Sequence, residues 1–344
     1  MLPHSCLRSL SVNHNAIAGE AAAHLASVAV AESSLVRFGG LPIDRLRSND
    51  VEEIDLKDEN LGIPEATLLC HLLRSGAARS LRTLNLDGFP VPISDLKGMR
   101  PYVQSGAPEV IDLQGCKLGL ASFVVVGHLL SSNTVLQSLI LDDNPLGAEG
   151  AEKIADGLRV NQSLTLLSLC NSNLGVQGAM KIAKALQSNT SLATLRLGDN
   201  KIGGHDNWSS CATQRTVSSL EGPAAIALAL ARNRTLTELS LNGNALRAEG
   251  AAKVVLPLQS ENRTLLSLSL DDNELKKHGA AAITEMLKVN STLTTLSVAS
   301  NGIDMVETRR LIEAAGERVA VRLDFERAAV RTGASEDEVE GPAG

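Results

Sequence analysis

Leucines and one asparagine recur along most of this chain in a fixed arrangement. From Leu136 to Leu146 the order is L-x-x-L-x-L-x-x-N-x-L, with Asn144 as the asparagine. The same arrangement begins again at Leu7, Leu164, Leu192, Leu236, Leu265 and Leu293, and looser copies begin at Leu35, Val51, Leu81 and Pro108. Five of the intervals between consecutive starts are 28 residues long. Because self-similarity at a fixed period marks a repeat architecture, the chain is predicted to be an array of about eleven units.

Each unit predicts a strand, a turn and a helix. Leu139 and Leu141 alternate like one face of a short strand, whereas apolar residues between 147 and 158 recur at helical spacing. Because helices are wider than strands, stacked units should curve into a right-handed α/β horseshoe. Its single parallel sheet should line the concave side and its helices the convex side. We expect the strand leucines to be buried in one core.

Two sets of asparagines recur with the repeat. Asn144 and the asparagines at the same position of other units should bond backbone groups of adjacent turns and form a ladder. Four units have another residue at this position, and the ladder should be interrupted there, at Glu59, Phe89, Cys116 and Ser172. A second set lies three residues before the first leucine of a unit, at Asn133, Asn161, Asn189, Asn233, Asn262 and Asn290. Five of these six begin an N-x-S/T string, but their periodic position favours a helix-ending role over glycosylation. Asparagine tolerates the left-handed conformation that often ends a helix.

The repeat resembles the ribonuclease-inhibitor type of leucine-rich repeat, whose units have a similar length and a full helix. The resemblance extends over roughly residues 6–323. It implies the horseshoe fold and says much less about function. Similar arrays occur in the ligand-sensing ends of NOD-like receptors, in Ran GTPase-activating proteins and in many repeat proteins of protists and algae, and the last group is the most similar in style.

The pattern breaks in two related segments near the N-terminus. The unit at Leu35 reaches Val51 after only 16 residues. The segments 42–47 and 92–97 share the string P-I-x-x-L followed by a basic residue, which indicates an old duplication of a repeat pair. Because proline interrupts regular helix, we expect turns and short helical pieces here on the convex side. A drifted repeat is favoured over a functional loop.

A polar insertion at 205–220 lengthens one unit to 44 residues and contains Trp208, the only tryptophan. A long loop on a rigid scaffold is often a binding element. The alternative is an excursion whose tryptophan shields the neighbouring helix. Both interpretations remain open at this stage.

The expected domain organisation is a single repeat domain over 1–331 and a disordered tail over 332–344, which is rich in Gly, Ser and Glu. A helix over 305–315 and an edge strand over 319–323 should cap the C-terminal end. At the N-terminus the first repeat begins within a few residues of Met1, and no polar cap is visible there. We therefore expect either a truncated product or an end that a partner covers in a larger assembly.

Composition narrows the function classes. The net charge is −7, which argues against a nucleic-acid binder. Cys6, Cys70, Cys116, Cys170 and Cys211 show no metal-site spacing, and they are expected to be free thiols in a reducing compartment. Neither a signal peptide nor an apolar run of about 20 residues for membrane insertion is recognisable. The expected location is the cytoplasm, with the nucleus and the cilium as alternatives.

Catalytic signatures are not found in the sequence. The strings GxxxxGK[ST], HExxH and GxSxG do not occur, and the histidines are isolated. We therefore expect no catalytic residues, no cofactor and no metal, and predict a protein that is not an enzyme. One alternative is GTPase activation of the Ran type, for which Arg37 and Arg196 are candidates although neither lies in a recognisable motif. Another is the ligand-sensing fragment of a NOD-like receptor, which would require a nucleotide-binding module.

Acidic residues outnumber basic residues at the strand and turn positions that should face solvent. The candidate partner-binding residues are Glu53, Asp55, Asp112, Asp142, Asp143, Arg196, Asp199, Trp208, Glu238 and Asp271. Aspartates beside the asparagine turn have a second interpretation, because they often cap backbone N–H groups. The function predicted is binding of a protein partner with a basic surface to an acidic concave face. Since aromatic anchors are scarce, the contact should be polar and sensitive to salt.

Overall fold

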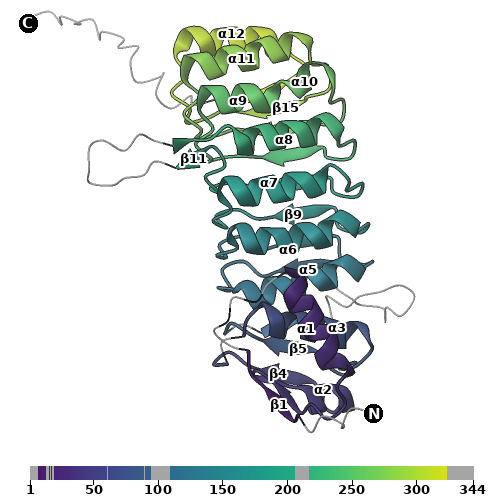
Figure 1. The fold of residues 1–344 in the computed structure, drawn as a ribbon. Coiled ribbons are helices and arrows are strands. Elements are labelled where there is room, and N and C mark those ends of the chain that lie inside the picture. Colours follow the sequence, from purple (N-terminus) through teal and green to yellow (C-terminus); the bar gives the residue numbers. More distant parts are fainter. Residues whose placement is uncertain are drawn as a thin grey trace, which may run out of the picture.

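The structure of the protein is a computed structural model that describes residues 7–12, 15, 17, 19–59, 61–88, 90–93, 109–205 and 217–323. Strand–helix units stack one upon another along an elongated array, with strands in one layer and helices in the other (Figure 1). This is the α/β leucine-rich-repeat solenoid that the sequence pattern predicts. None of the helices in these residues is long and apolar enough to cross a membrane.

The regular part of the array is one parallel sheet. Its strands are β7 (Val110–Asp112), β8 (Ser138–Ile140), β9 (Leu166–Ser168), β10 (Thr194–Arg196), β13 (Glu238–Ser240), β14 (Ser267–Ser269), β15 (Thr295–Ser297) and β16 (Ala320–Arg322). Equivalent leucines are paired across the sheet, as Leu139 is with Leu167 and Leu167 with Leu195. The register therefore follows the repeat.

Helices follow the strands and form the second layer. They are α1 (Gly19–Ala31), α2 (Ile43–Ser48), α3 (Ile63–Arg74), α5 (Leu120–Ser132), α6 (Gly147–Val160), α7 (Gly175–Leu186), α8 (Glu221–Arg232), α9 (Arg247–Val255), α10 (Pro257–Ser260), α11 (Lys276–Val289) and α12 (Met305–Ala315). A single apolar core runs between the layers from Ala26 to Val319. The central leucines of β8, β9, β10 and β13 are at most 1% exposed, which confirms their predicted burial: Leu139, Leu167, Leu195 and Leu239.

The first units depart from the expected single sheet. Strands β1 (Ser9–Leu10), β2 (Arg37–Phe38) and β3 (Leu41–Pro42) form one small sheet, and β4 (Glu53–Asp55), β5 (Thr83–Asn85) and β6 (Pro90–Pro92) form another. In both, the last strand returns antiparallel to its neighbour. Proline has no N–H to donate to a further strand, so a strand that contains it suits a sheet edge. The expectation of one continuous sheet is therefore wrong for these units.

Each return strand ends at the first proline of a duplicated P-I-x-x-L segment, Pro42 or Pro92. After the first, Ile43–Ser48 forms the short helical piece that the sequence predicts. After the second, residues 94–108 lie outside the described part. The antiparallel return before each string was not anticipated.

The predicted ladder of buried asparagines is confirmed. Asn144, Asn200, Asn244, Asn273 and Asn301 are at most 2% exposed. In the central example, the Asn200 Nδ2 donates to the carbonyl oxygens of Leu169, at 2.6 Å, and of Leu197 and Gly198. Its Oδ1 accepts from the backbone N–H groups of Ser172 and Leu174. One amide thus satisfies five backbone groups of two adjacent turns.

The interruption expected at Ser172 is only partial. The Ser172 hydroxyl donates to the Leu141 carbonyl at 3.3 Å, which is the bond that an asparagine would make there. In the described residues no backbone N–H donates to this hydroxyl in return. A serine hydroxyl is too short to reach both sides of the turn. At Ser172 the hydrogen bond that the side chain donates is therefore kept, and the hydrogen bonds that an asparagine Oδ1 would accept are lost. At Cys116 the one hydrogen bond of the thiol to a described residue goes to the Gln114 carbonyl, at 3.6 Å.

The second set of asparagines lies at the helix ends, as predicted, but the predicted left-handed backbone is wrong. Asn161 has φ −67° and ψ 139°, which is extended and not left-handed backbone. Its Nδ2 donates to the carbonyls of Leu130 and Asn133, and its Oδ1 accepts from the N–H of Leu164. These residues therefore form a second ladder beneath the helix ends. The nitrogen that a glycan would occupy is buried and already bonded, which supports the structural interpretation over glycosylation.

Two glycines bring α5 and α6 into backbone contact. A Cβ added at Gly157 would overlap the Gly127 carbonyl oxygen, and one added at Gly127 would overlap the Lys153 carbonyl oxygen. Gly157→Ala should therefore lower the free energy of unfolding by about 1–3 kcal/mol, because overpacking outweighs the gain in helix propensity. Chemical denaturation measures the change. Gly150→Ala is the control, since its Cβ would meet only side chains, and an equal loss in both variants would contradict the assignment.

Candidate binding surface on the strands and turns

We define the strand face as the solvent side of the parallel sheet, formed by the residues that alternate with the buried leucines. Most of its residues are small and partly exposed: Ser138, Ile140, Leu166, Thr194, Ser240, Ser267, Ser269 and Thr295. Charges on the regular sheet are few. Arg196 and Glu238, both among the predicted binding residues, form an ion pair of 3.5 Å across neighbouring strands. The strand face itself is therefore mainly a surface of hydroxyl and small apolar groups.

Two of the predicted acids, Asp142 and Asp271, are bound to the backbone of the next repeat. The Asp142 Oδ1 accepts from the Cys170 N–H at 2.7 Å, and its Oδ2 accepts from the Ser168 hydroxyl. The Asp271 Oδ1 accepts in the same way from the Ala299 N–H, also at 2.7 Å. The capping interpretation, which the sequence left open, applies to both residues. Reversing either charge is consequently expected to disturb folding as well as binding.

Three other aspartates form an exposed row at the turns that follow the strands. Asp143, Asp199 and Asp272 occupy the same repeat position, and we call this row the turn ridge. Their φ values are 58°, 56° and 52°, a left-handed conformation that aspartate tolerates better than most residues. None of the three makes an ion pair with the residues that the structure describes. Asp272 was not among the predicted binding residues, although alignment of the repeats on Asp143 would have identified it.

The turn ridge carries negative charge that no ion pair with a described residue offsets. The pKa of the Asp199 carboxyl is raised, first because it is partly buried and then because Asp272 and Asp143 lie along the same row. The pKa of Asp143 is lowered, because Asn171 donates to it at 2.8 Å and Gln114 at 2.6 Å. Asp143 thus stays ionised, and the negative charge of Asp143 and Asp272 raises the pKa of Asp199 further.

This repulsion predicts that neutralising Asp199 stabilises the fold. Because its pKa is raised in the folded protein, folding disfavours the charged carboxylate at neutral pH, and the penalty disappears as the pH falls through the raised pKa. Asp199→Asn should increase the free energy of unfolding by about 0.5 kcal/mol or less at neutral pH, since solvent screens an exposed group. Asparagine already occupies the equivalent position at Asn171, with φ 49°. Denaturation at neutral and acid pH measures the gain, and a loss at neutral pH would contradict the prediction.

The remaining predicted residues lie apart from the turn ridge. Glu53 and Asp55 are exposed on β4, in the separate N-terminal sheet. Asp112 ends β7, where its Oδ1 accepts from the Gln114 N–H at 2.9 Å. Trp208 lies outside the described residues. The ends of its insertion pair as an antiparallel ladder of β11 (Gly204–His205) and β12 (Val217–Ser218), which fixes where the insertion leaves and rejoins the array (Figure 1).

The groups considered for chemistry are engaged or isolated. Arg37 lies 3.7 Å from Glu59, and Arg196 pairs with Glu238, so both arginines considered for GTPase activation face a carboxylate. Across the described ranges no cluster of three His, Cys, Asp or Glu residues could hold a metal ion. Burial raises the pKa of the Cys70 thiol to about 12, which makes it a poor nucleophile.

Comparison with known proteins supports the repeat assignment. A family model described as "Leucine Rich repeat" matches residues 132–155, 232–255, 261–283 and 289–304. Protein CARMIL of Dictyostelium discoideum is 30% identical over 122 residues, which are 33% of this chain and 11% of that protein. The chain thus corresponds to about a tenth of that relative.

Two solved structures are also similar. The leiomodin-1 Actin-Binding Site 2 has 21% sequence identity and a TM-score of 0.34, with 43% of this chain and 75% of the other covered. The leucine-rich repeat-containing protein LegL7 from Legionella pneumophila has 16% identity and a TM-score of 0.38, with 94% and 85% covered.

Proposed function

We propose that this chain, which is a leucine-rich-repeat protein, is a non-enzymatic scaffold that binds a protein partner with a basic surface along its turn ridge and strand face. The observation that carries the proposal is the row of exposed aspartates, Asp143, Asp199 and Asp272, none of which forms an ion pair with a described residue. Residence in the cytoplasm belongs to the same proposal.

The scaffold holds these charges in place before a partner arrives. Each turn is fixed by the buried asparagine ladder, and Asp142 and Asp271 tie successive turns together. Little conformational freedom is therefore lost when a partner docks, which favours affinity. Aligned carboxylates steer a Lys- or Arg-bearing surface into encounter and set its orientation.

The strand face beside the turn ridge supplies short-range contacts. Its serine and threonine hydroxyls both donate and accept hydrogen bonds, and Ile140 and Leu166 add a small apolar patch. Among its described residues there is no aromatic side chain to serve as an anchor. Since aromatic residues and arginine dominate binding hot spots, the expected contact is polar and of moderate affinity.

Affinity capture from the native cell, with three forms of the chain as bait, tests the proposal. The turn-ridge variant carries Asp143→Asn, Asp199→Asn and Asp272→Asn, which suit the left-handed turns. The matched control removes three carboxylates from exposed helix positions instead: Glu149→Gln, Glu249→Gln and Glu285→Gln.

A protein retained by the wild type and the helix control, but lost from the turn-ridge variant, is the expected partner. Equal retention by all three forms would contradict the proposal. A further variant, Trp208→Ala, tests the insertion as a competing binding site. If the partner is lost from Trp208→Ala but retained by the turn-ridge variant, the insertion is the binding site.

A further inference from the structure

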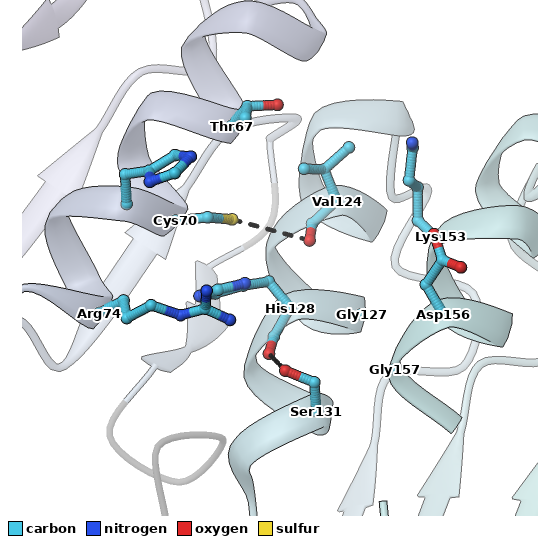
Figure 2. Close-up of a pocket in the computed structure, with 11 residues that line it drawn as sticks. Thr67, Cys70, Arg74, Val124, Gly127, His128, Ser131, Lys153, Asp156 and Gly157 are labelled. Carbon is cyan, nitrogen blue, oxygen red and sulfur yellow. Dashed lines mark hydrogen bonds between the residues drawn. The ribbon is translucent and has the colours of Figure 1, made fainter. Parts of the chain in front are cut away.

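The helical layer contains a pocket between α3, α5 and α6, on the side of the molecule away from the strand face (Figure 2). Its volume is about 240 Å³ and it opens to solvent. Helix α3 contributes His71 and Arg74 to the lining, α5 contributes His128, and α6 contributes Lys153 and Asp156. This pocket is independent of the proposed partner-binding surface.

Several bases line this pocket, His71 and His128 among them. The Arg74 side chain extends toward His128, whereas the Lys153 side chain points away from both (Figure 2). Burial, together with Arg74 and His71, lowers the pKa of His128 to about 4, so its ring is neutral near neutral pH. Burial is the largest cause of this lowered pKa, and the positive charge of Arg74 and His71 adds to it.

The acids near the pocket do not neutralise it. Asp156 is the only carboxylate in the lining, and it lies 3.7 Å from Arg159. Glu152 is paired with Lys181 at 3.0 Å. Within the part of the chain that the structure describes, neither Arg74 nor Lys153 forms an ion pair. The pocket is therefore a basic depression in a chain whose net charge is −7.

We propose that this pocket binds a phosphate group. The Arg74 guanidinium offers a planar fork of donors, and the imidazoles of His71 and His128 offer further donors. Lys153 adds positive charge at the edge of the pocket that α6 forms.

Binding should be coupled to proton uptake at His128. The titratable and charged groups that line the pocket together with His128 are His71 and Arg74 from α3, and Lys153 and Asp156 from α6. A bound anion offsets the positive charge of Arg74, so it should raise the pKa of His128.

Histidine ring NMR signals of the full chain, titrated with inorganic phosphate at constant ionic strength, test this proposal. At about pH 7.5, where inorganic phosphate is mainly a dianion, the His71 and His128 signals should shift and saturate. The exposed His24 and His278 should not shift. If phosphate leaves His71 and His128 unchanged, or shifts all four alike, the proposal is overturned.

Variants assign the effect to the pocket. Arg74→Gln should weaken phosphate binding roughly tenfold, as expected for a lost charged hydrogen bond, and Lys153→Gln should weaken it less. Lys253→Gln, on the exposed side of α9, is the matched control and should bind like the wild type. Circular dichroism verifies that each variant is folded. Equal weakening by Lys253→Gln would refute the site.

A third set of titrations distinguishes the source of the phosphate group. A phosphoserine peptide is compared with inorganic phosphate and with the same peptide unphosphorylated. Tighter binding of the phosphopeptide identifies a phosphorylated side chain as the ligand, and equal binding identifies a free phosphate. Both outcomes support the pocket, whereas equal binding of the two peptides would overturn it.

Discussion

Asn200→Ala is expected to lower the free energy of unfolding by about 2–4 kcal/mol, because it leaves buried backbone groups without partners. The Asn200 amide makes five hydrogen bonds to the backbone, and its side chain is 0% exposed. Among them, the Leu169 carbonyl and the Leu174 N–H would lose the amide as a partner. Chemical denaturation followed by circular dichroism measures the change.

Two further variants separate the ladder from a general effect of substitution. Gln162→Ala removes an exposed amide that bonds Thr190 at 2.9 Å, and it should change stability little. Ser172→Asn restores the acceptor missing from the ladder and should stabilise the fold by up to about 1 kcal/mol. If Asn200→Ala is no more harmful than Gln162→Ala, the ladder does not hold the turns.

Leu197→Ala should lower the free energy of unfolding by about 2–5 kcal/mol, through lost burial and the cavity that remains. Leu197 is 0% exposed and follows β10, in the middle of the sheet. Because each repeat packs only on its neighbours, the loss should appear first as faster hydrogen exchange in the adjoining units β9 and β13. Leu266→Ala is the control, since Leu266 is 44% exposed, and a similar loss there would contradict the account.

The regular repeats could be predicted from sequence because the same residue type recurs at each buried position in several units. The period places Leu139, Leu167 and Leu195 at one position, and the register of the sheet follows from it. Asn144 and Asn200 were assigned correctly for the same reason. A polar residue that returns at one position in every unit, between buried leucines, must bond to the backbone of its neighbours.

The predictions were wrong where the conformation of a residue depends on a hydrogen-bond partner or a neighbouring strand that the period of the repeat does not identify. The strands that contain Pro42 and Pro92 turn back on their neighbours, which depends on the chain that precedes them. Asn161 and its equivalents reach the helix end of the preceding repeat, so their backbone need not be left-handed. Asp142 is bonded to the next repeat, whereas Asp143 has a left-handed backbone and is exposed, and one sequence does not show this difference.

The proposed phosphate pocket could not be predicted from the sequence, for a related reason. His71 and His128 are 57 residues apart, and each appeared isolated along the chain. Direct packing of α3 on α5 brings them together, while the intervening irregular unit disturbs the repeat spacing that would have aligned them.

The central claim is that the turn ridge attracts a basic partner, and the association rate of the captured partner tests it most directly. The rate is measured for the wild type, the turn-ridge variant and the helix control, at low and at high salt. At low salt the account predicts that the wild type and the helix control associate roughly tenfold faster than the turn-ridge variant. The difference should vanish as salt shortens the Debye length below about 10 Å. Equal rates for all three forms at low salt would contradict the account.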